Sequence, residues 1–282
     1  MALLQVRLIS IFKIIRPINF LITFFTAVVA SIICTASSLP VIKIILASVS
    51  AGLTASAGNI INDIIDIEID KINRPTRPLP SGKLTIKGAY ALYFICIILS
   101  VVLAVLVNTI VLVIVLFTHL VLFLYSKYLK RIPFIGNIIV AFLTGLVFIF
   151  GGVIVENSSA AIIPALFAFL INLIRELVKD MQDVEGDRAA GVITFPIKFG
   201  FQKTKYLITF ITLILILFTL YPFITKLYEI EYVIIVMVIV NPFLVFILKK
   251  LFEDDSIRNL KKMSNLLKLN MVFGLIAIYL GV

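Results

Sequence analysis

The 282-residue sequence has little charge, a single histidine and only two cysteines. Charged residues make up 14% of the chain and hydrophobic residues 62%, whereas soluble domains are about half apolar and about a quarter charged. Residues 90–107 and 208–220 contain no charge at all. This composition excludes an ordinary soluble domain. It predicts an all-α protein that crosses the membrane several times.

The single histidine and the two cysteines give no indication of a catalytic or redox site. His119 is the only histidine and falls in the middle of an apolar segment, so we interpret it as structural and predict no histidine base. Cys34 and Cys96 also lie in apolar segments and are interpreted as packing residues. The apolar segments are continuous rather than alternating, which argues against a β-barrel.

The apolar segments predict a bundle of about nine transmembrane helices around a central cavity that opens toward the cytoplasm. We treat residues 1–282 as one transmembrane domain with two pseudo-repeats, roughly 15–155 and 160–282. The predicted spans are 15–36, 41–61, 88–106, 109–125, 134–155, 160–175, 205–222, 231–248 and 264–281.

The formal net charge of +10 invites a nucleic-acid interpretation, but the basic residues are not scattered. With nine spans, all 25 lysines and arginines fall on one side except Lys43, Lys226 and Lys268. The positive-inside rule places the basic side, with the N-terminus, in the cytoplasm. The charge therefore predicts a multi-pass membrane protein whose cations mark topology and face anionic lipid. It predicts no nucleic-acid partner and implies no protein partner.

Acidic residues are also scarce, and nine of the 15 lie in two short stretches, 63–70 and 176–187. Each stretch continues the predicted cytoplasmic end of an apolar span. Each contains a triad spaced i, i+3 and i+7, which places the three carboxylates on one face of a helix. The matched spacing resembles an internal repeat. The two triads are Asp63, Asp66 and Asp70, and Asp180, Asp183 and Asp187.

Such carboxylate stripes need a cationic partner. Like charges one turn apart repel each other, and a carboxylate at membrane depth costs about 2.5–3.5 kcal/mol on insertion scales. Magnesium fits, because it prefers oxygen ligands and is commonly completed by substrate phosphates. Either stripe alone could instead be satisfied by neighbouring Lys and Arg. Two stripes in matched register favour a metal–pyrophosphate site.

Two basic segments follow these spans. After the first stripe, prolines at 75, 78 and 80 interrupt the helix, so Arg74, Arg77 and Lys83 can be presented to a phosphate by a semi-rigid loop. A second segment carries Tyr125, Lys127 and Lys130 after the fourth predicted span. It could bind phosphate or anchor the helix at the membrane interface, and the sequence leaves both readings open.

The two motifs identify a family resemblance. Asn62-Asp63 through Asp70, with the following Asn73-Arg74-Pro75 and Arg77-Pro78, resembles the first signature of the UbiA superfamily of intramembrane prenyltransferases. Asp183 through Arg188 resembles the second. The resemblance spans essentially the whole chain, including the Arg16-Pro17 start of the first span.

The resemblance implies a Mg²⁺-dependent prenyltransferase. It implies catalytic roles for Asp66, Asp70, Asp183 and Asp187, which would hold metal together with Asn62, Asp63 and Asp180. The side chains implied in binding the prenyl diphosphate and the acceptor are Asn19, Arg77, Tyr125, Lys127, Lys130, Lys179 and Arg188, with the choice between the lysines at 127 and 130 open.

Finer features resemble archaeal members of the superfamily. These are residues 124–131, Gly136-Asn137, Thr144-Gly145 and Gly151-Gly152. Such enzymes transfer geranylgeranyl from its diphosphate to the hydroxyl of geranylgeranylglyceryl phosphate and form the second ether bond of archaeal lipids. The alternatives are an aromatic quinone precursor or a tetrapyrrole as acceptor and, more distantly, a cation-coupled transporter. Transporters place acidic sites near the bilayer centre on broken helices, unlike these helix ends.

Overall fold

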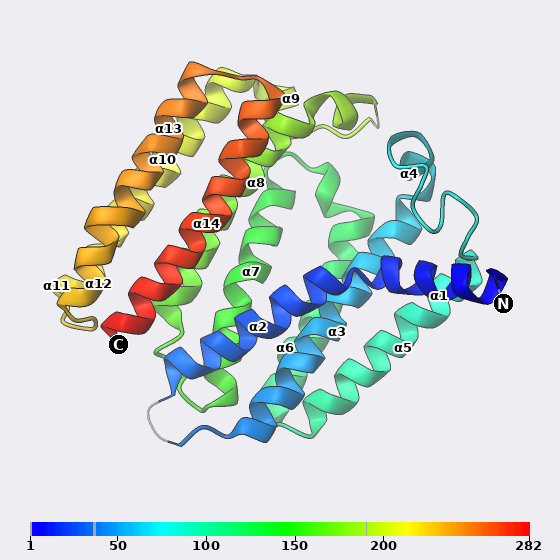
Figure 1. The fold of residues 1–282 in the computed structure, drawn as a ribbon, viewed down its shortest axis with the longest axis horizontal. Helices are drawn as coiled ribbons and strands as arrows, with labels where there is room; N and C mark the ends of the chain where they lie inside the picture. The colour runs from blue at the N-terminus through cyan, green and yellow to red at the C-terminus, as the bar shows by residue number, and fades with distance from the viewer. Residues whose placement is uncertain (1, 36–37, 190) are drawn as a thin grey trace. The chain divides into compact units, whose positions relative to one another are not determined.

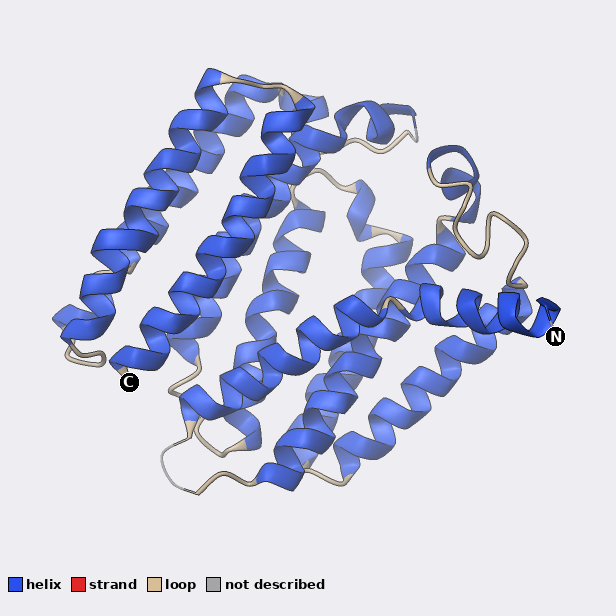
Figure 2. Cartoon of the chain, in the orientation of Figure 1, coloured by secondary structure: helices blue, strands red, loops and turns tan. Residues whose placement is uncertain are grey.

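The computed structural model describes residues 2–35, 38–189 and 191–282. All regular structure in these ranges is helical, with no strand (Figure 2). The predicted all-α class is confirmed. The chain divides into two compact units. Unit 1 comprises residues 1–130 and 147–161, and unit 2 comprises residues 131–146 and 162–282.

Unit 1 is built around helix α3, which packs against α2, α5 and α6 (Figure 1). The end of α7 also belongs to this unit. Helix α4 continues the path of α3 and carries the end of the first aspartate motif. The helices are α1 (Ala2–Ile15), α2 (Pro17–Cys34), α3 (Val41–Ile65), α4 (Ile67–Asn73), α5 (Ile86–Val105), α6 (Thr109–Lys127) and α7 (Ile135–Ile154).

Small residues explain why α3 can occupy the centre of unit 1. Its buried positions include Ala47, Ser50 and Ala57. The ring of Phe20 on α2 lies 2.6 Å from where a Cβ on Gly52 would stand. Membrane helices lack a hydrophobic driving force for association, so close backbone approach through small side chains supplies much of their packing.

Unit 2 is built from the long helix α8 and a set of helices packed around it. Helix α8 packs against α10 and α14, which lie beside it in Figure 1. The start of α7 and a short 3₁₀ turn, Leu129–Arg131, lead into this unit. The helices are α8 (Ile162–Ala189), α9 (Phe195–Phe199), α10 (Phe201–Phe218), α11 (Tyr221–Ile224), α12 (Ile230–Ile235), the π-helix η2 (Val236–Val240), α13 (Asn241–Glu253) and α14 (Ile257–Gly281).

Eight helical segments in the described ranges are long and apolar enough to cross a membrane. They match eight of the nine predicted spans. The remaining one, 160–175, lies in α8, where charges at Arg175, Glu176 and Lys179 shorten the apolar stretch. Helix α8 is 28 residues long. A ninth crossing and the predicted central cavity therefore stay predictions.

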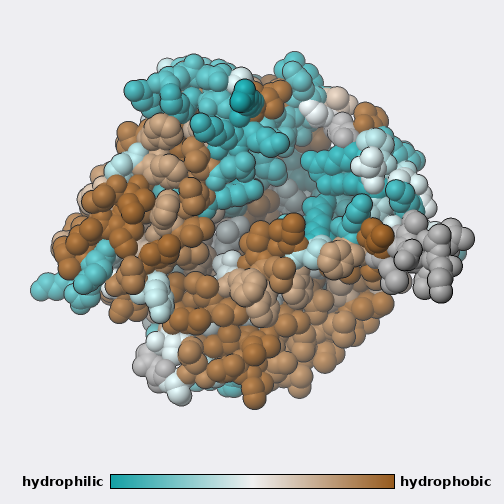
Figure 3. Space-filling model, viewed as in Figure 1, coloured by the Kyte–Doolittle hydropathy of each residue, from teal (hydrophilic) through white to brown (hydrophobic). Residues whose placement is uncertain are grey.

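The surface of the spans is apolar, as a lipid-facing surface requires. Ile98 is 59% exposed, and Leu217 and Val238 are each 68% exposed. Figure 3 shows broad apolar surfaces, with polar side chains gathered over helix ends such as α4 and the junction of α13 and α14. A soluble monomer rarely exposes continuous apolar surface on this scale. The multi-pass membrane prediction is confirmed.

Local sequence signals set several helix ends. The Asn108 side chain accepts a hydrogen bond from the Val111 N–H, at 2.8 Å, and caps the start of α6. Thr85 and Ser256 cap α5 and α14 in the same way. Such caps satisfy amide donors that a helix leaves unpaired.

The scarce histidine and cysteines lie in the interior of unit 1. His119 Nε2 is 2.8 Å from the Ser100 Oγ, and Ser50 Oγ donates to the Ser100 carbonyl at 2.7 Å. Both Cys34 and Cys96 are buried and free. These contacts join α3, α5 and α6, in agreement with a structural role for His119.

Candidate active site

The first aspartate motif spans a break between two helices. Helix α3 ends at Ile65, and Asp66 takes φ −90° and ψ 8° before α4 begins. The Asp70 N–H still donates to the Asp66 carbonyl at 2.7 Å. The predicted single helix is therefore wrong in this detail. The helical path continues across the break closely enough to keep the three carboxylates near one another.

Two of these carboxylates are buried and share one arginine. Arg77 Nη1 lies 3.1 Å from Asp63 Oδ1 and 2.5 Å from Asp70 Oδ2. Asp63 also pairs with Arg16 Nη2. Asp63 and Asp70 are only 4% and 5% exposed. The shared arginine confirms that the i and i+7 positions face the same way.

The proline-rich loop holds Arg77 in place. Pro78 and Leu79 are buried, and Leu79 belongs to the apolar cluster beneath the motif, which also contains Ile60 and Ile64. The Leu84 N–H donates to the Pro78 carbonyl at 3.0 Å, which closes the loop. Arg74, in contrast, is exposed. The sequence thus anchors the loop by its apolar residues and turns one arginine inward.

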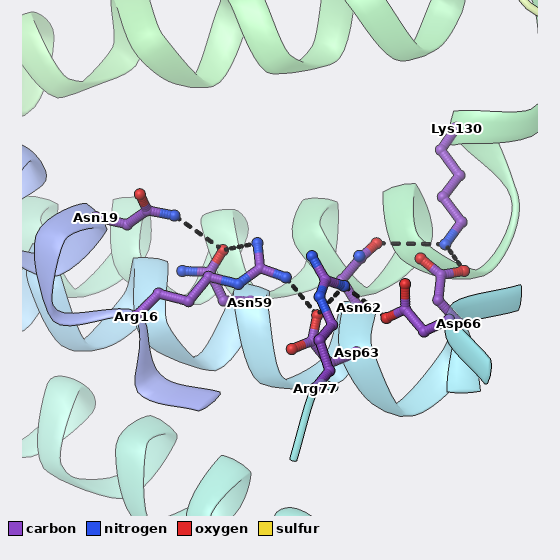
Figure 4. A network of polar contacts seen from close by, with 9 residues as sticks. Arg16, Asn19, Asn59, Asn62, Asp63, Asp66, Arg77 and Lys130 are labelled. Atoms are coloured by element: carbon purple, nitrogen blue, oxygen red, sulfur yellow. Dashed lines mark hydrogen bonds and ion pairs between the residues drawn. The ribbon is translucent and has the colours of Figure 1, made fainter. Parts of the chain in front are cut away.

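The third carboxylate meets a lysine from the segment after α6. Lys130 Nζ pairs with Asp66 and lies 3.3 Å from Asn62 Oδ1, as Figure 4 shows. Lys127 lies over the rings of Phe123 and Tyr128, at 5.7 and 5.0 Å from their centroids. The side chain of Lys130 is 12% exposed. The two lysines that the sequence left undistinguished therefore have different surroundings: Lys130 joins the aspartates and Lys127 stacks on aromatic rings.

The start of α2 supplies the other side of this network. Arg16 Nη1 donates to Asn59 Oδ1 at 3.2 Å, and Asn19 donates to the same oxygen at 3.4 Å. Arg16 has φ 53°, a left-handed conformation that non-glycine residues rarely adopt. Its side chain is hydrogen-bonded to both Asn59 and Asp63. Asn59 was not predicted, although an amide one turn before Asn62 in an apolar helix was a usable signal.

The side-chain oxygens of the first motif are of the kind that Mg²⁺ prefers as ligands. Three carboxylates face three cations, Arg16, Arg77 and Lys130, so the cluster is locally neutral. Within the described ranges, no group of three His, Cys, Asp or Glu side chains stands close enough to hold a metal together. All nearby donors are carboxylate or amide oxygens, which suit Mg²⁺ with few protein ligands, water and phosphate completing its shell.

The second motif lies on the uninterrupted helix α8. Asp180 accepts a hydrogen bond from Asn137 Nδ2 at 2.8 Å, and Asp183 accepts one from Gln182 at 3.3 Å. Asp183 and Asp187 are partly exposed. The pKa of Asp180 is raised to about 7. Desolvation by burial is the largest cause, the hydrogen bond from Asn137 opposes it, and the nearby Asp187 and Glu176 add to it.

The other side chains predicted to bind substrate lie on α6 and α8. Tyr125 lies partly buried in the last turn of α6. Lys179 is half-exposed and lies 3.6 Å from Glu176, and Arg188 is exposed at the end of α8. The structure also shows Asn137 beside the second motif. The sequence showed it only as part of a family-like Gly-Asn pair.

Residues 23–272 match the model of the UbiA prenyltransferase family. The chain belongs to the UbiA prenyltransferase family. Its relatives include the digeranylgeranylglyceryl phosphate synthase of Methanocaldococcus jannaschii, 34% identical over 100% of this chain and 99% of the relative. The synthase of Methanobrevibacter smithii is 37% identical over 95% and 96%.

Solved structures of related proteins have a similar fold. A structure of digeranylgeranylglyceryl phosphate synthase in membranes has a TM-score of 0.84 and 34% identity, covering 98% of each chain. A UbiA homologue from Archaeoglobus fulgidus, bound to GPP and Mg²⁺, has a TM-score of 0.71. It covers 95% of this chain and 99% of its own. At 17% identity, that second similarity shows the fold alone.

Proposed function

We propose that this UbiA-family enzyme transfers a geranylgeranyl group from geranylgeranyl diphosphate to the free hydroxyl of geranylgeranylglyceryl phosphate. One observation carries the proposal. Relatives named digeranylgeranylglyceryl phosphate synthase are 34% and 37% identical over nearly the whole chain. The first aspartate cluster, with its cations, supplies the chemistry that a prenyl diphosphate needs.

The reaction breaks the bond between the allylic carbon and the diphosphate oxygen. The acceptor oxygen forms an ether bond to that carbon, and diphosphate and a proton are released. Bound Mg²⁺ would neutralise the diphosphate and so stabilise it as a leaving group. The apolar interiors of the units would keep water from the allylic cation.

We assign the metal-binding role in the first motif to Asn62, Asp66 and Asp70, and in the second motif to Asp183 and Asp187, with Asp180 as a further ligand. The surroundings of Asp63 favour a different task. It is enclosed by Arg16 and Arg77, so it positions two guanidinium groups rather than a metal.

The cations then have separate tasks. Arg77 and Lys130 lie at the first cluster, where a diphosphate would meet them as its metal binds the aspartates. Asn19, which donates to Asn59, orients that edge of the cluster. We assign Tyr125 and Arg188 to the substrate-facing helix ends and Lys127 to the membrane interface, where aromatic and lysine side chains commonly anchor a helix.

The orientation of the bundle belongs to the same proposal. We assign both motifs and the N-terminus to the cytoplasmic side, and the excess of basic residues beside the motifs supports this assignment. A ninth crossing by α8 would bring both motifs to that side. The two pseudo-repeats, each contributing one aspartate motif, stay a prediction.

The test is product identification. The purified protein, reconstituted in lipid nanodiscs, is incubated with radiolabelled geranylgeranyl diphosphate and a panel of acceptors, with and without Mg²⁺. Label should pass to geranylgeranylglyceryl phosphate only with Mg²⁺. Transfer to an aromatic or tetrapyrrole acceptor instead would overturn the acceptor assignment. Release of diphosphate without a prenylated product would overturn the transferase assignment.

A further inference from the structure

A cluster of basic side chains in unit 2 joins Lys179, which the family resemblance implies in substrate binding, to two residues that the resemblance leaves without a role. Arg175 and Lys179 project from α8, and Lys268 comes from the adjacent helix α14. Lys268 is within electrostatic range of Arg175, Lys179 and Glu176. Asp180 also lies within electrostatic range of Lys179, so three cations face two carboxyl groups, which leaves a local excess of positive charge.

One edge of the Arg175 guanidinium, at Nε, makes no described hydrogen bond. Its Nη1 donates to Asn172 Oδ1 at 3.3 Å and to Glu176 Oε1 at 2.7 Å. Its Nε is buried and has no hydrogen-bond partner within the described residues. A buried donor without an acceptor is costly, and in native proteins it commonly indicates an ion or ligand. The Nε edge is the one that arginine uses to bind an oxyanion through two parallel hydrogen bonds.

The surroundings of Arg175 fix its orientation. Asn172 and Glu176 are 5% and 8% exposed, and the Asn172 amide also donates to Thr144 Oγ1 at 3.0 Å. The guanidinium is therefore held by a buried, hydrogen-bonded frame on one side. Lys179 and Lys268 are exposed, so an anion can reach the cluster.

The cluster is in register with the second aspartate motif. Arg175, Lys179, Asp183 and Asp187 follow one another at intervals of four residues along α8, so they form one ridge of the helix. The cationic half lies deeper along the helix than the acidic half. At about 1.5 Å per residue, Arg175 is roughly 12 Å and Lys179 roughly 6 Å from Asp183 along the axis.

We propose that Arg175, Lys179 and Lys268 bind the phosphate of the acceptor lipid. This inference rests on the proposed function, in which the acceptor carries a phosphate monoester. The free hydroxyl of such a glyceryl phosphate lies only a few bonds from phosphorus. A phosphate held by the cationic half of the ridge therefore places the hydroxyl beside a donor diphosphate held at Asp183 and Asp187. The cluster selects a phosphorylated acceptor over a neutral one.

The experiment compares two acceptors and two lipids. Wild type, Lys268→Gln and Arg175→Lys are assayed in nanodiscs with geranylgeranylglyceryl phosphate and with its dephosphorylated analogue. Lys268 has no ion pair in the described structure, and Arg175→Lys keeps a charge beside Glu176, so both variants should fold. Lys262→Gln, which removes an exposed charge from the same helix, is the control.

Each variant should raise the KM for the phosphorylated acceptor by on the order of 10–100-fold, as expected for a charged hydrogen bond. The donor KM should stay within about twofold of wild type. With the dephosphorylated analogue, wild type and variants should have equal kcat/KM. The Lys262→Gln enzyme should match wild type with both acceptors.

Four results would overturn the proposal. Equal losses with both acceptors would show a structural role. An effect seen in anionic nanodiscs but absent in neutral ones would assign the cluster to bulk lipid headgroups. Failure of wild type to use the phosphorylated acceptor would refute the proposed function together with this subsite. If wild type uses that acceptor and both variants keep the wild-type KM for it, the subsite alone is refuted.

Discussion

Replacing Arg77 with methionine tests whether the first aspartate cluster is balanced as the structure shows. Arg77 bridges Asp63 and Asp70. Its loss leaves Asp63 with Arg16 but leaves Asp70 without an ion pair among the described residues. Methionine keeps most of the volume of the side chain, so the change removes charge rather than packing.

The magnitude follows from burial. Breaking a buried pair by removing one partner costs about 3–5 kcal/mol. The Asp70 side chain is 7% exposed and that of Arg77 is 20% exposed, so the lower end, about 3 kcal/mol, applies. For a chain of this size, that corresponds to a loss of roughly 6–12 °C in thermal midpoint.

The assay is thermal unfolding in detergent, followed by circular dichroism. Arg74→Met is the control, because Arg74 is an exposed arginine of the same loop, and its midpoint should stay near wild type. Adding Asp70→Asn to Arg77→Met should recover most of the loss, since the stranded charge is gone. Strictly additive effects, or equal losses for the two arginine variants, would refute the proposed balance of charges.

Three further predictions test separate parts of the structure. Lys130→Gln should raise the donor KM by about tenfold or more, because Lys130 reaches the aspartates, while Lys127→Gln should stay within about twofold in the same steady-state assay; equal effects would contradict this separation. With a metal chelator present, the wild-type thermal midpoint should fall as pH rises from about 4 to about 7. Folded Asp180, with its pKa of about 7, retains a proton that the unfolded chain has already lost. Asp180→Asn should lack this decline, and parallel curves for the two proteins would exclude the raised pKa. Gly151→Ala should destabilise the protein by about 1–3 kcal/mol, since its Cβ would stand 2.5 Å from a neighbouring Cβ. Gly274→Ala, with nothing within 4 Å, should be neutral or slightly stabilising, and the reverse order of midpoints would contradict the packing.

Much of the fold could be predicted from the sequence, because each membrane span is a long run of uncharged, apolar residues. Long uncharged runs must form helices in lipid, and eight predicted spans correspond to helical segments of the structure. The spacing of Asp63 and Asp70 also predicted their common face. It could not predict the break at Asp66, because a one-residue change in backbone angles leaves the spacing intact.

The partners of the aspartates were harder to predict. Arg16 and Lys130 lie 47 and 64 residues from the carboxylates that they pair with. Local pattern does not encode such pairings, because they depend on how helices pack. This explains why Lys127 and Lys130 were indistinguishable in the sequence, and why the frame around Arg175 was not recognised.

We propose that each of the two aspartate motifs takes part in binding Mg²⁺ and diphosphate. The direct measurement is the Mg²⁺-dependent rate of geranylgeranyl transfer by wild type, Asp66→Ala and Asp183→Ala, each shown by circular dichroism to be folded. Each single variant should lose at least about 10²–10³-fold in kcat, the scale seen when one stabilising group for developing charge is removed. Near wild-type transfer by both folded variants would contradict the assignment of metal and diphosphate to these motifs.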